Sequence, residues 1–424
     1  MPDTRSIAQQ LGSIVGGENL HQAGREDSVC GVQPKFVAEP RNEQQLAATL
    51  AYANGAGLAV IPRGGGSKLD WGNPPKRADM VVSTRHLSRI IEHAWADLTV
   101  SVEAGCTLEA LAQTLAQHGQ RLAFDGLWPE RATVGGVLAT NDSGSLRLRF
   151  GPLRDLIIGV TLALPDGTLA TSGGKVVKNV AGYDLPKLAT GALGTLGVVT
   201  RAIFRVHPLP HDATTLTCAI DRVSEAQRPL AQVLDSKLAY SALQVRLPDS
   251  ERAEAFIDIL FEGTQQGIAA QIVQLETLAA PFRFRESPPS PWGARRELHA
   301  QLGGKQTYSA LLKISALPAD AIPALTDLTT MGVSLVHAHA VVQATGLGTI
   351  LLSGDEQHVR HIATVFRERM QRAGGSLVAL GSSLLTRDFD AWGDPGDALP
   401  LMRAIKHQLD PCQTLNPARF VGGI

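Results

Sequence analysis

A strand that runs directly into three consecutive glycines is the feature of this sequence that most restricts its fold. The apolar run at residues 57–61 predicts a strand, and Gly64, Gly65 and Gly66 follow almost at once. Glycine adopts positive φ angles readily and leaves the backbone N–H groups unobstructed. Such a turn is either a plain tight turn or a concave nest of N–H groups that binds an anion such as a pyrophosphate. The turn alone leaves both interpretations open.

Glycine is also concentrated further along the chain. Thirteen of the 75 residues in 126–200 are glycine, against 42 of 424 in the whole chain. These glycines lie between predicted strands at 156–164 and 198–206, which indicates backbone that approaches a flat or charged group closely. Within this region, small residues dominate 133–144. That segment either lines a ligand with backbone amides or forms a tightly packed contact between a helix and a sheet.

The predicted elements divide the chain into regions. Residues 36–208 alternate short strands with helices at 40–56 and 107–118, and the proline-containing segment 207–211 interrupts this pattern and predicts a domain boundary. The region that follows is typical of a small α+β domain with one face of its sheet covered. Its predicted elements are strands at 216–220, 242–247, 310–314 and 349–352, helices at 252–259 and 356–373, and a surface loop at 286–292. A last helix at 399–408 precedes a tail.

Composition excludes several classes of protein. Lys and Arg number 39 and Asp and Glu number 40, with no basic block, so nucleic acid is not an expected partner. No apolar run reaches the roughly 18 residues of a membrane helix, and the start does not have the layout of a signal peptide, so we expect a cytoplasmic chain without a transmembrane segment. The four cysteines form no CxxC pair, which argues against an iron–sulfur cluster or a structural zinc site and favours buried thiols.

Two nucleotide-binding motifs are rejected. A Walker loop around Gly174-Lys175 would need glycine at 169 and serine or threonine at 176, where the chain has leucine and valine. No GxGxxG opens a helix after a strand, so a nicotinamide-binding Rossmann fold is disfavoured.

Other residues allow a functional and an ordinary interpretation. His337 and His339 would share one face of a strand and could bind a metal, but no carboxylate accompanies them in sequence, so we predict an ordinary strand or interface and no metal site. Arg246 could bind a substrate carboxylate, although a solvated strand arginine is favoured. Cys106 and Cys412 have no neighbouring histidine, which gives nucleophilic catalysis little support. The tryptophans at 71, 128 and 292 are predicted to be packing residues.

The order of the glycine-rich blocks carries a resemblance to a known family. PRGGGS at 62–67, ATVGGVLATNDSG at 132–144, and GGKVVKNVAGYD at 173–184 with GALGTLGVV at 191–199 resemble the flavin domain of the vanillyl-alcohol-oxidase/PCMH superfamily. The third block and the tail from LPLMR to NPARF are similar to the FAD-binding E subunit of bacterial glycolate oxidase. The resemblance implies an α+β fold: a PCMH-type FAD-binding domain of two α+β subdomains at 1–208, a ferredoxin-like antiparallel cap at 209–395, and a C-terminal helix and tail at 396–424 that return to the FAD domain.

The resemblance also implies which residues bind the cofactor. The pyrophosphate loop would be Pro62, Arg63, Gly64, Gly65, Gly66, Ser67 and Lys68. The adenine–ribityl side would be lined by Thr133, Val134, Gly135, Gly136, Ala139, Thr140, Asn141 and Gly144, with Pro129 beside them. The ring system would be approached by Gly182, Tyr183, Gly194, Gly197, Val198, Val199 and, from the tail, Asn416. Ser67 stands where covalent members often carry histidine, so FAD should be bound non-covalently. Ala418 stands where the family usually has glycine.

The function that the resemblance implies is that of a subunit. The chain would be the FAD-binding subunit of a glycolate (D-2-hydroxyacid) oxidase or dehydrogenase complex that oxidises glycolate to glyoxylate. Its partners would be a catalytic flavin subunit and an iron–sulfur subunit, and the complex could hold it peripherally at the inner membrane. Catalytic relatives carry cap motifs like GHxGDGNxH and EHGIG, which are not found here, so catalytic residues are left unassigned. The alternatives are a self-sufficient FAD-dependent D-2-hydroxyacid dehydrogenase and a scaffold subunit with a non-catalytic flavin site.

Overall fold

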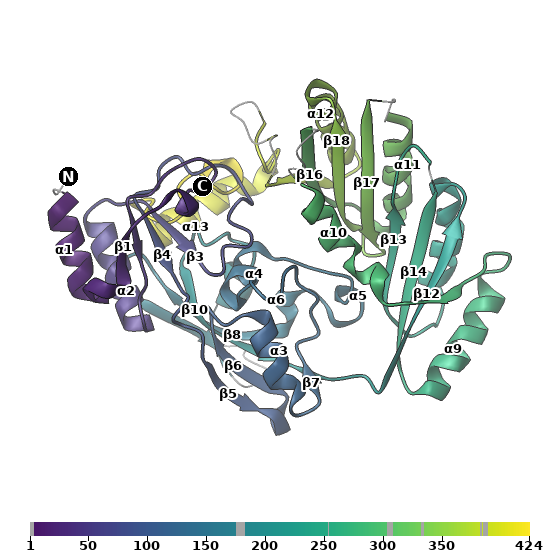
Figure 1. The fold of residues 1–424 in the computed structure, drawn as a ribbon, viewed down its shortest axis with the longest axis horizontal. Coiled ribbons are helices and arrows are strands. Elements are labelled where there is room, and N and C mark those ends of the chain that lie inside the picture. Colours follow the sequence, from purple (N-terminus) through teal and green to yellow (C-terminus); the bar gives the residue numbers. More distant parts are fainter. Residues whose placement is uncertain are drawn as a thin grey trace. The chain divides into compact units, whose positions relative to one another are not determined.

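The computed structural model (Figure 1) describes residues 4–174, 183–252, 254–302, 308–331, 335–381, 384 and 389–424. The chain divides into two compact units. The first consists of Met1–Ser143, Gly151–Leu209 and Asp394–Ile424, and the second of Gly144–Phe150 and Pro210–Gly393. The chain therefore changes unit at the proline-containing segment 207–211. The short segment 144–150 belongs to the second unit, although we expected it within the FAD domain.

The first unit begins with a four-stranded sheet whose carboxyl edge holds the triple-glycine turn. The strand order is β1-β2-β4-β3, and β2, β4 and β3 are parallel. The elements are α1 (Thr4–Val15), β1 (Leu20–Gln22), β2 (Phe36–Ala38), α2 (Glu43–Gly55), β3 (Val60–Arg63) and β4 (Met80–Ser83). Helix α2 begins where Asn42 accepts a hydrogen bond from the N–H of Gln45 at 2.8 Å. Leu11 of α1 and Leu46 and Leu50 of α2 are fully buried in the core shared with this sheet.

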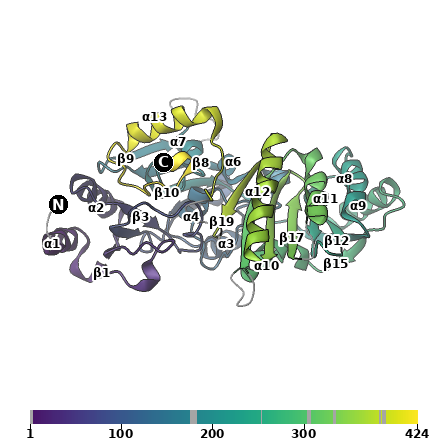
Figure 2. The ribbon, with the colours of Figure 1, turned by 90° about the horizontal axis from the view of Figure 1, so that it is seen from above.

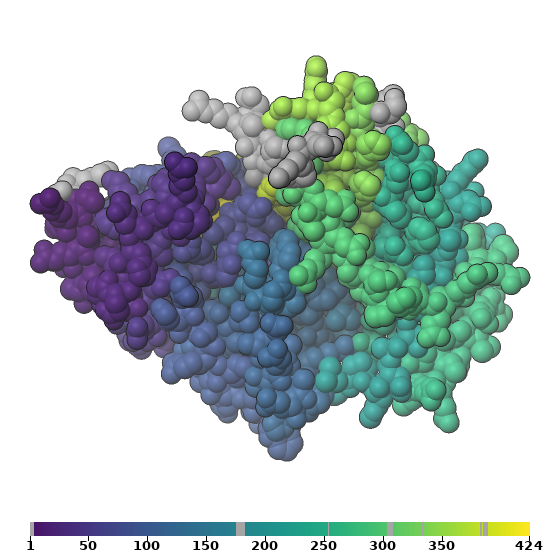
Figure 3. Space-filling model, viewed as in Figure 1, coloured from purple at the N-terminus to yellow at the C-terminus, as the bar shows by residue number. Residues whose placement is uncertain are grey.

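The second sheet of this unit is antiparallel, with strand order β5-β6-β10-β8-β9. Its strands are β5 (Ile90–Ala94), β6 (Thr99–Glu103), β8 (Ile157–Ala163), β9 (Leu169–Gly173) and β10 (Val198–Arg205), accompanied by α3 (Leu108–Ala116), α4 (Val134–Thr140), α6 (Leu153–Leu156), α7 (Leu185–Ala189) and the pair β7 (Gln120–Arg121) and β11 (His207–Pro208). The predicted strands at 156–164 and 198–206 and the helix at 107–118 are confirmed. Helix α3 begins at Thr107, whose hydroxyl accepts from the N–H of Ala110 at 3.2 Å. In the space-filling view the colours of these segments run from blue to teal (Figure 3).

The second unit is built on an eight-stranded antiparallel sheet of order β15-β12-β14-β13-β17-β18-β16-β19. The strands are β12 (Asp212–Ile220), β13 (Tyr240–Leu247), β14 (Ala255–Gly263), β15 (Arg285–Ser287), β16 (Tyr308–Ser315), β17 (Val336–Gln343), β18 (Leu347–Gly354) and β19 (Ser376–Leu380). Its core lies between the sheet and α8 (Gln227–Leu234), α9 (Gln265–Leu278), α11 (Ala321–Met331) and α12 (Glu356–Arg372), which are seen from above in Figure 2. Helices α5 (Arg147–Phe150) and α10 (Ala294–Gln301) also contact strands of the sheet, and Leu148 of α5 packs against the core.

Two predictions about the second unit are wrong. The segment 252–259 is not a helix, because β14 begins at Ala255 and pairs with both β12 and β13. Its buried Ile257, Ile259 and Phe261 alternate along the strand and face the core, which is the period of a strand. The loop predicted at 286–292 instead contains the end of β15 and a 3₁₀ turn at Ser290–Gly293.

The chain ends against the first unit. Helix α13 (Leu399–Leu409) leads into a tail in which Leu415 forms a parallel bridge with Val60 at the start of β3. Among the helices of the described residues, none combines the length and the apolar character needed to span a membrane.

Candidate functional site

Two adjoining recesses lie around the triple-glycine turn in the first unit. Both recesses are open to solvent and enclose about 460 and 480 Å³ of empty space. They share one wall, made by Pro62, Arg63, Gly64, Gly136, Ala139, Leu193 and Asn416. Gly65, Gly66, Ser67, Lys68, Thr133 and Thr140 line only the first recess, and Gly135, Gly194, Gly197, Val198 and Val199 line only the second. The structure thus brings most of the predicted cofactor-binding residues together.

The triple-glycine turn packs directly against the segment that precedes α4. A Cβ atom on Gly64 would lie 2.0 Å from Oγ1 of Thr133, and one on Gly65 would lie 1.7 Å from the carbonyl oxygen of Arg131. Gly66 has a φ of +70°, and a Cβ there would make only ordinary van der Waals contacts, the nearest at 3.8 Å. Glycine is therefore required at 64 and 65 by this close approach and is favoured at 66 by the backbone conformation.

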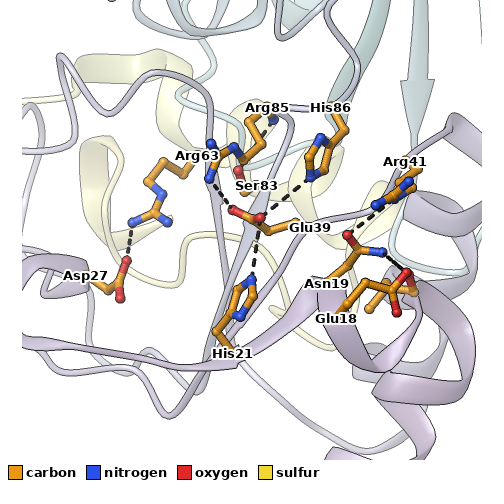
Figure 4. A network of polar contacts seen from close by, with 11 residues as sticks. Glu18, Asn19, His21, Asp27, Glu39, Arg41, Arg63, Ser83, Arg85 and His86 are labelled. Carbon is orange, nitrogen blue, oxygen red and sulfur yellow. Dashed lines mark hydrogen bonds and ion pairs between the residues drawn. The ribbon is translucent and has the colours of Figure 1, made fainter.

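Arg63, the last residue of β3, lines both recesses and forms an ion pair with Asp27 (Figure 4). Its Nη1 lies 2.5 Å from Oδ1 of Asp27. Burial raises the pKa of Asp27, but the hydrogen bonds from Arg63 and from the N–H of Gly24 outweigh it and hold that pKa below its usual value. The pair therefore stabilises the fold above the ordinary aspartate pKa, and this contribution is lost as the pH falls through the lowered value.

A second polar cluster lies at the same edge of the sheet, centred on the buried Glu39 after β2 (Figure 4). Its carboxylate lies 3.3 Å from Nη1 of Arg85 and 3.6 Å from the Nε2 atoms of His86 and His21. The sequence analysis missed this cluster. Polar residues directly after two neighbouring parallel strands were the available signal, because the carboxyl ends of parallel strands meet at one edge.

Helix α4 forms the wall opposite the turn. It begins at Thr133, whose hydroxyl accepts from the N–H of Gly136 at 3.4 Å. A Cβ on Gly135 would lie 2.9 Å from Cβ of Ala104, so this part of the segment is a close contact between helix and sheet. Gly136, Ala139 and Thr140 line a recess. Within the small residues at 133–144, Gly135 therefore forms the close contact between helix and sheet, whereas Gly136, Ala139 and Thr140 line the first recess.

Lys68, at the end of the turn, is a buried cation with a carboxylate beside it. Its Nζ lies 3.4 Å from Oδ2 of Asp142, which is fully buried and also accepts from the N–H of Leu127 at 2.9 Å. The ammonium lies 5.8 and 5.4 Å from the ring centroids of Trp71 and Trp128. The two tryptophans therefore pack around this charge, and cation–π attraction contributes to holding it.

Asn416 enters both recesses from the tail. Its side-chain amide donates to the carbonyl of Leu193 at 2.6 Å, and its N–H donates to the carbonyl of Val60 at 2.9 Å. The Oδ1 atom of Asn416 is buried without a hydrogen-bond partner, as is Oδ1 of Asn141 at the end of α4. An unsatisfied buried acceptor costs about 1–3 kcal/mol, so the Oδ1 atom of Asn416 favours a ligand that carries hydrogen-bond donors. Asn141, although predicted to bind the cofactor, lines neither recess.

Some predicted residues lie elsewhere. Val134 is fully buried in the core under the second sheet, and the carbonyl of Pro129 accepts from the N–H of Glu109 at the start of α3. Tyr183 is 91% exposed, and Gly144 belongs to the second unit. Gly182 lies outside the described residues. The structure adds lining residues that the sequence analysis did not select, namely Leu69, Thr84, Ala189, Leu193 and Arg419.

The tail is anchored by a buried ion pair. Nζ of Lys406 lies 2.5 Å from Oδ2 of Asp410 and donates to the carbonyls of Thr195 and Leu415 at 2.8 and 3.0 Å. Asp410 in turn accepts from the N–H groups of Thr414 and Leu415. Burial lowers the pKa of Lys406, and the Asp410 carboxylate opposes this shift. The pair therefore connects the tail to the loop before β10.

The tail also holds strained backbone, which leads to a stability prediction. Ala418 has a φ of +67°, a conformation that costs an L residue about 1–2 kcal/mol. We expect Ala418→Gly to raise the free energy of unfolding by about 0.5–1 kcal/mol in urea denaturation, because strain relief exceeds the added freedom of the unfolded chain. Ala404→Gly in α13 is the control and should lower the free energy of unfolding by about 1 kcal/mol, because glycine is a poor helix former. A destabilised Ala418→Gly protein would contradict the strain argument.

In the second unit, Arg246 is not the solvated strand arginine that was favoured. Its Nε and Nη2 lie 2.6 and 3.0 Å from the two oxygens of Asp258, which is fully buried. Asp258 also accepts from Gln244 at 3.0 Å and from Thr217 at 2.9 Å. Sequence proximity could not reveal this network, because its members come from three different strands.

The fold also supplies the carboxylates that His337 lacks in sequence. Nδ1 of His337 lies 3.5 Å from Oε1 of Glu251, and ligand atoms of Asp249, Glu251 and His337 all lie within 4.8 Å of one another. The ring of His339 instead contacts the carbonyl of Pro248. No carboxylate accompanies the two histidines in sequence, but the fold brings two of them to His337, and the paired side chains of His337 and Glu251 are about half exposed. A metal-free cap stays a prediction.

Thiol chemistry has no support at the buried Cys106. Burial, with a smaller contribution from Glu103, raises the pKa of its thiol to about 11. The thiol is therefore protonated at neutral pH and is a poor nucleophile.

Comparison with known proteins agrees with this geometry. The FAD binding domain family matches residues 34–173. The D-2-hydroxyglutarate dehydrogenase of Bos taurus mitochondria is 33% identical over 91% of this chain and 77% of its own length. The probable mitochondrial D-lactate dehydrogenase of Danio rerio is 25% identical over 98% of this chain and 90% of its own. The glycolate oxidase subunit GlcD of Bacillus subtilis (strain 168) is 29% identical over 57% of this chain, and the match spans only 53% of that protein.

Solved structures show the same fold. An alkyldihydroxyacetonephosphate synthase superposes with a TM-score of 0.76 at 16% identity, covering 98% of this chain and 85% of the other. The 4-ethylphenol oxidase of Gulosibacter chungangensis superposes with a TM-score of 0.73 at 12% identity, covering 98% and 96%. The fold is therefore that of the PCMH-type flavin oxidases. Together with the extended similarity to the bovine protein, this shows that the chain belongs to the FAD-linked oxidoreductase family that contains the D-lactate and D-2-hydroxyglutarate dehydrogenases.

Proposed function

We propose that the chain is the FAD-binding subunit of a multi-subunit 2-hydroxyacid oxidoreductase that converts glycolate to glyoxylate and passes the electrons to an iron–sulfur subunit. The observation that carries the proposal is the double recess, in which a glycine turn, the wall of α4 and Asn416 of the tail meet. The similarity to a glycolate oxidase subunit supports glycolate as the substrate of the complex. A catalytic flavin subunit is the second expected partner.

The residues of the two recesses fit FAD. The cofactor offers an anionic pyrophosphate, several hydroxyl and N–H donors, and a flat ring system. The turn at 64–67 can present unobstructed N–H groups to the pyrophosphate. The orphaned Oδ1 atom of Asn416 can accept a hydrogen bond from a cofactor donor. Ala139, Leu193 and Val199 provide an apolar wall.

The chemistry of the complex follows from the cofactor and the substrate class. When bound, FAD would supply an acceptor for the hydride of the α-carbon of a 2-hydroxy acid, whose hydroxyl proton would go to a base. The residues of this chain bind and orient the cofactor and exclude water from it. Ser67 cannot form the histidyl link to the flavin, so we infer non-covalent binding. For the proposed subunit we infer a location in the cytoplasm or, through the complex, at the membrane surface.

Two observations favour a subunit over a self-sufficient enzyme. Arg246, which could otherwise recognise a substrate carboxylate, is paired with Asp258, and His337 is paired with Glu251. The self-sufficient alternative is supported by the dehydrogenases that match nearly the whole chain. A scaffold subunit that does not bind flavin would be the third case.

A spectroscopic experiment separates these functions. We expect the purified chain to show the visible absorption bands of a flavin and to release FAD when denatured. Under anaerobic conditions the isolated chain should remain oxidised with glycolate, D-lactate or D-2-hydroxyglutarate. Bleaching by any of these acids without partners would establish the self-sufficient enzyme. A protein that stays colourless after incubation with FAD would overturn the proposal in favour of the scaffold.

A further inference from the structure

Arg419 is a buried arginine at the first recess that the sequence analysis did not select. Its side chain lines the same recess as the triple-glycine turn, and the residue is only 2% exposed. The guanidinium donates to the backbone carbonyls of Leu69, Trp71 and Asn73, the last two at 2.7 and 3.3 Å. All three carbonyls belong to the segment that directly follows the turn at 64–68.

The tail and this segment are also joined through their main chains. The N–H of Asn73 donates to the carbonyl of Arg419 at 3.0 Å, and the N–H of Lys76 donates to the carbonyl of Pro417 at 3.0 Å. The segment after the turn is therefore held to the tail by main-chain hydrogen bonds and by the guanidinium. Because a guanidinium is a rigid fork of N–H donors, it fixes the orientation of several peptide groups at once.

We propose that Arg419 is a positioning residue for the pyrophosphate of the cofactor. By fixing the carbonyls of residues 69–73, it holds the end of the glycine turn in the conformation that presents its N–H groups to the anion. This inference rests on the proposal that the first recess binds the pyrophosphate of FAD.

Binding measurements on the apoprotein test this role. The variants are Arg419→Gln, which removes the charge and most donors, and Arg419→Lys, which keeps the charge but not the fork. We expect Arg419→Gln to weaken both FAD and ADP binding by about 10-fold to 100-fold, because each hydrogen bond from a charged group contributes substantially. Arg419→Lys should be intermediate. Flavin fluorescence quenching gives the dissociation constant for FAD, and calorimetry gives that for ADP.

Arg403→Gln is the matched control, because Arg403 also lies in the C-terminal region and donates to a backbone carbonyl, that of Gly422, away from both recesses. It should bind FAD and ADP like the wild type. A lower melting temperature of Arg419→Gln with unchanged dissociation constants would show a purely structural role and overturn the proposal. If Arg419→Gln does not fold, Arg419→Lys decides: wild-type affinity for FAD and ADP would overturn the positioning role. A wild-type chain that binds neither ligand would instead refute the FAD site itself.

Discussion

Replacing Gly65 with alanine is expected to yield a folded protein that is purified without flavin. The added Cβ would lie 1.7 Å from the carbonyl oxygen of Arg131, so the turn and the segment before α4 must move apart. That movement opens the recess where the turn presents its N–H groups. Overpacking of this kind costs about 1–3 kcal/mol or more, and we expect FAD affinity to fall roughly 100-fold. Flavin content per mole of purified protein and the dissociation constant of FAD measure the effect.

Gly66→Ala provides the control within the same turn. Its Cβ would have no atom nearer than 3.8 Å, so the only cost is the φ of +70°. We expect a loss of about 1 kcal/mol in stability with flavin retained. If Gly65→Ala retained flavin as well as Gly66→Ala does, the close approach of the two segments would not be what shapes the site.

Replacing Lys406 with methionine should be the most destabilising single change at the tail. It would leave the fully buried Asp410 carboxylate without its cation and the carbonyls of Thr195 and Leu415 without a donor. Breaking a buried ion pair in this way costs about 3–5 kcal/mol. Urea denaturation of the apoprotein measures the loss, and FAD affinity should fall with it because the loop before β10 loses its anchor.

Two further variants make this prediction specific. Glu356→Gln removes another i,i+4 ion pair, the surface pair between Glu356 and Arg360, and should cost no more than about 0.5 kcal/mol. The double variant Lys406→Met with Asp410→Leu should recover part of the stability, because no unpaired charge remains buried. Equal losses for Lys406→Met and Glu356→Gln would show that the buried pair contributes no more than an exposed one.

Local patterns in the sequence predicted the first unit well, for physical reasons. The strand before Gly64, the cap at Thr107 and the small residues of α4 depend on neighbours within a few positions. By contrast, the apolar residues of 252–259 fit both a helix and a strand, and only pairing with β12 and β13 decides between them. Short apolar runs are therefore resolved by tertiary context.

The charged groups of the site were the least predictable part. Asp258 and Arg246 meet across adjacent strands, and Glu251 reaches His337 from 86 positions away along the chain. Arg419 was visible in the tail motif, but nothing near it in sequence shows that its donors meet carbonyls at 69–73. Such contacts are created by the fold and are absent from any local pattern.

The contacts of the tail also have a consequence for the order in which the protein becomes functional. Arg419 and Trp71 are joined by a hydrogen bond across 348 residues, and the 184 residues of Pro210–Gly393 in the second unit lie between them along the chain. During synthesis on the ribosome, the tail residues that line the first recess, Asn416 and Arg419, are made only after the whole second unit. The closing of this long loop is a slow, entropically costly step. We therefore expect FAD to bind stably only to chains that have been synthesised beyond Arg419 and in which the tail has reached the first unit.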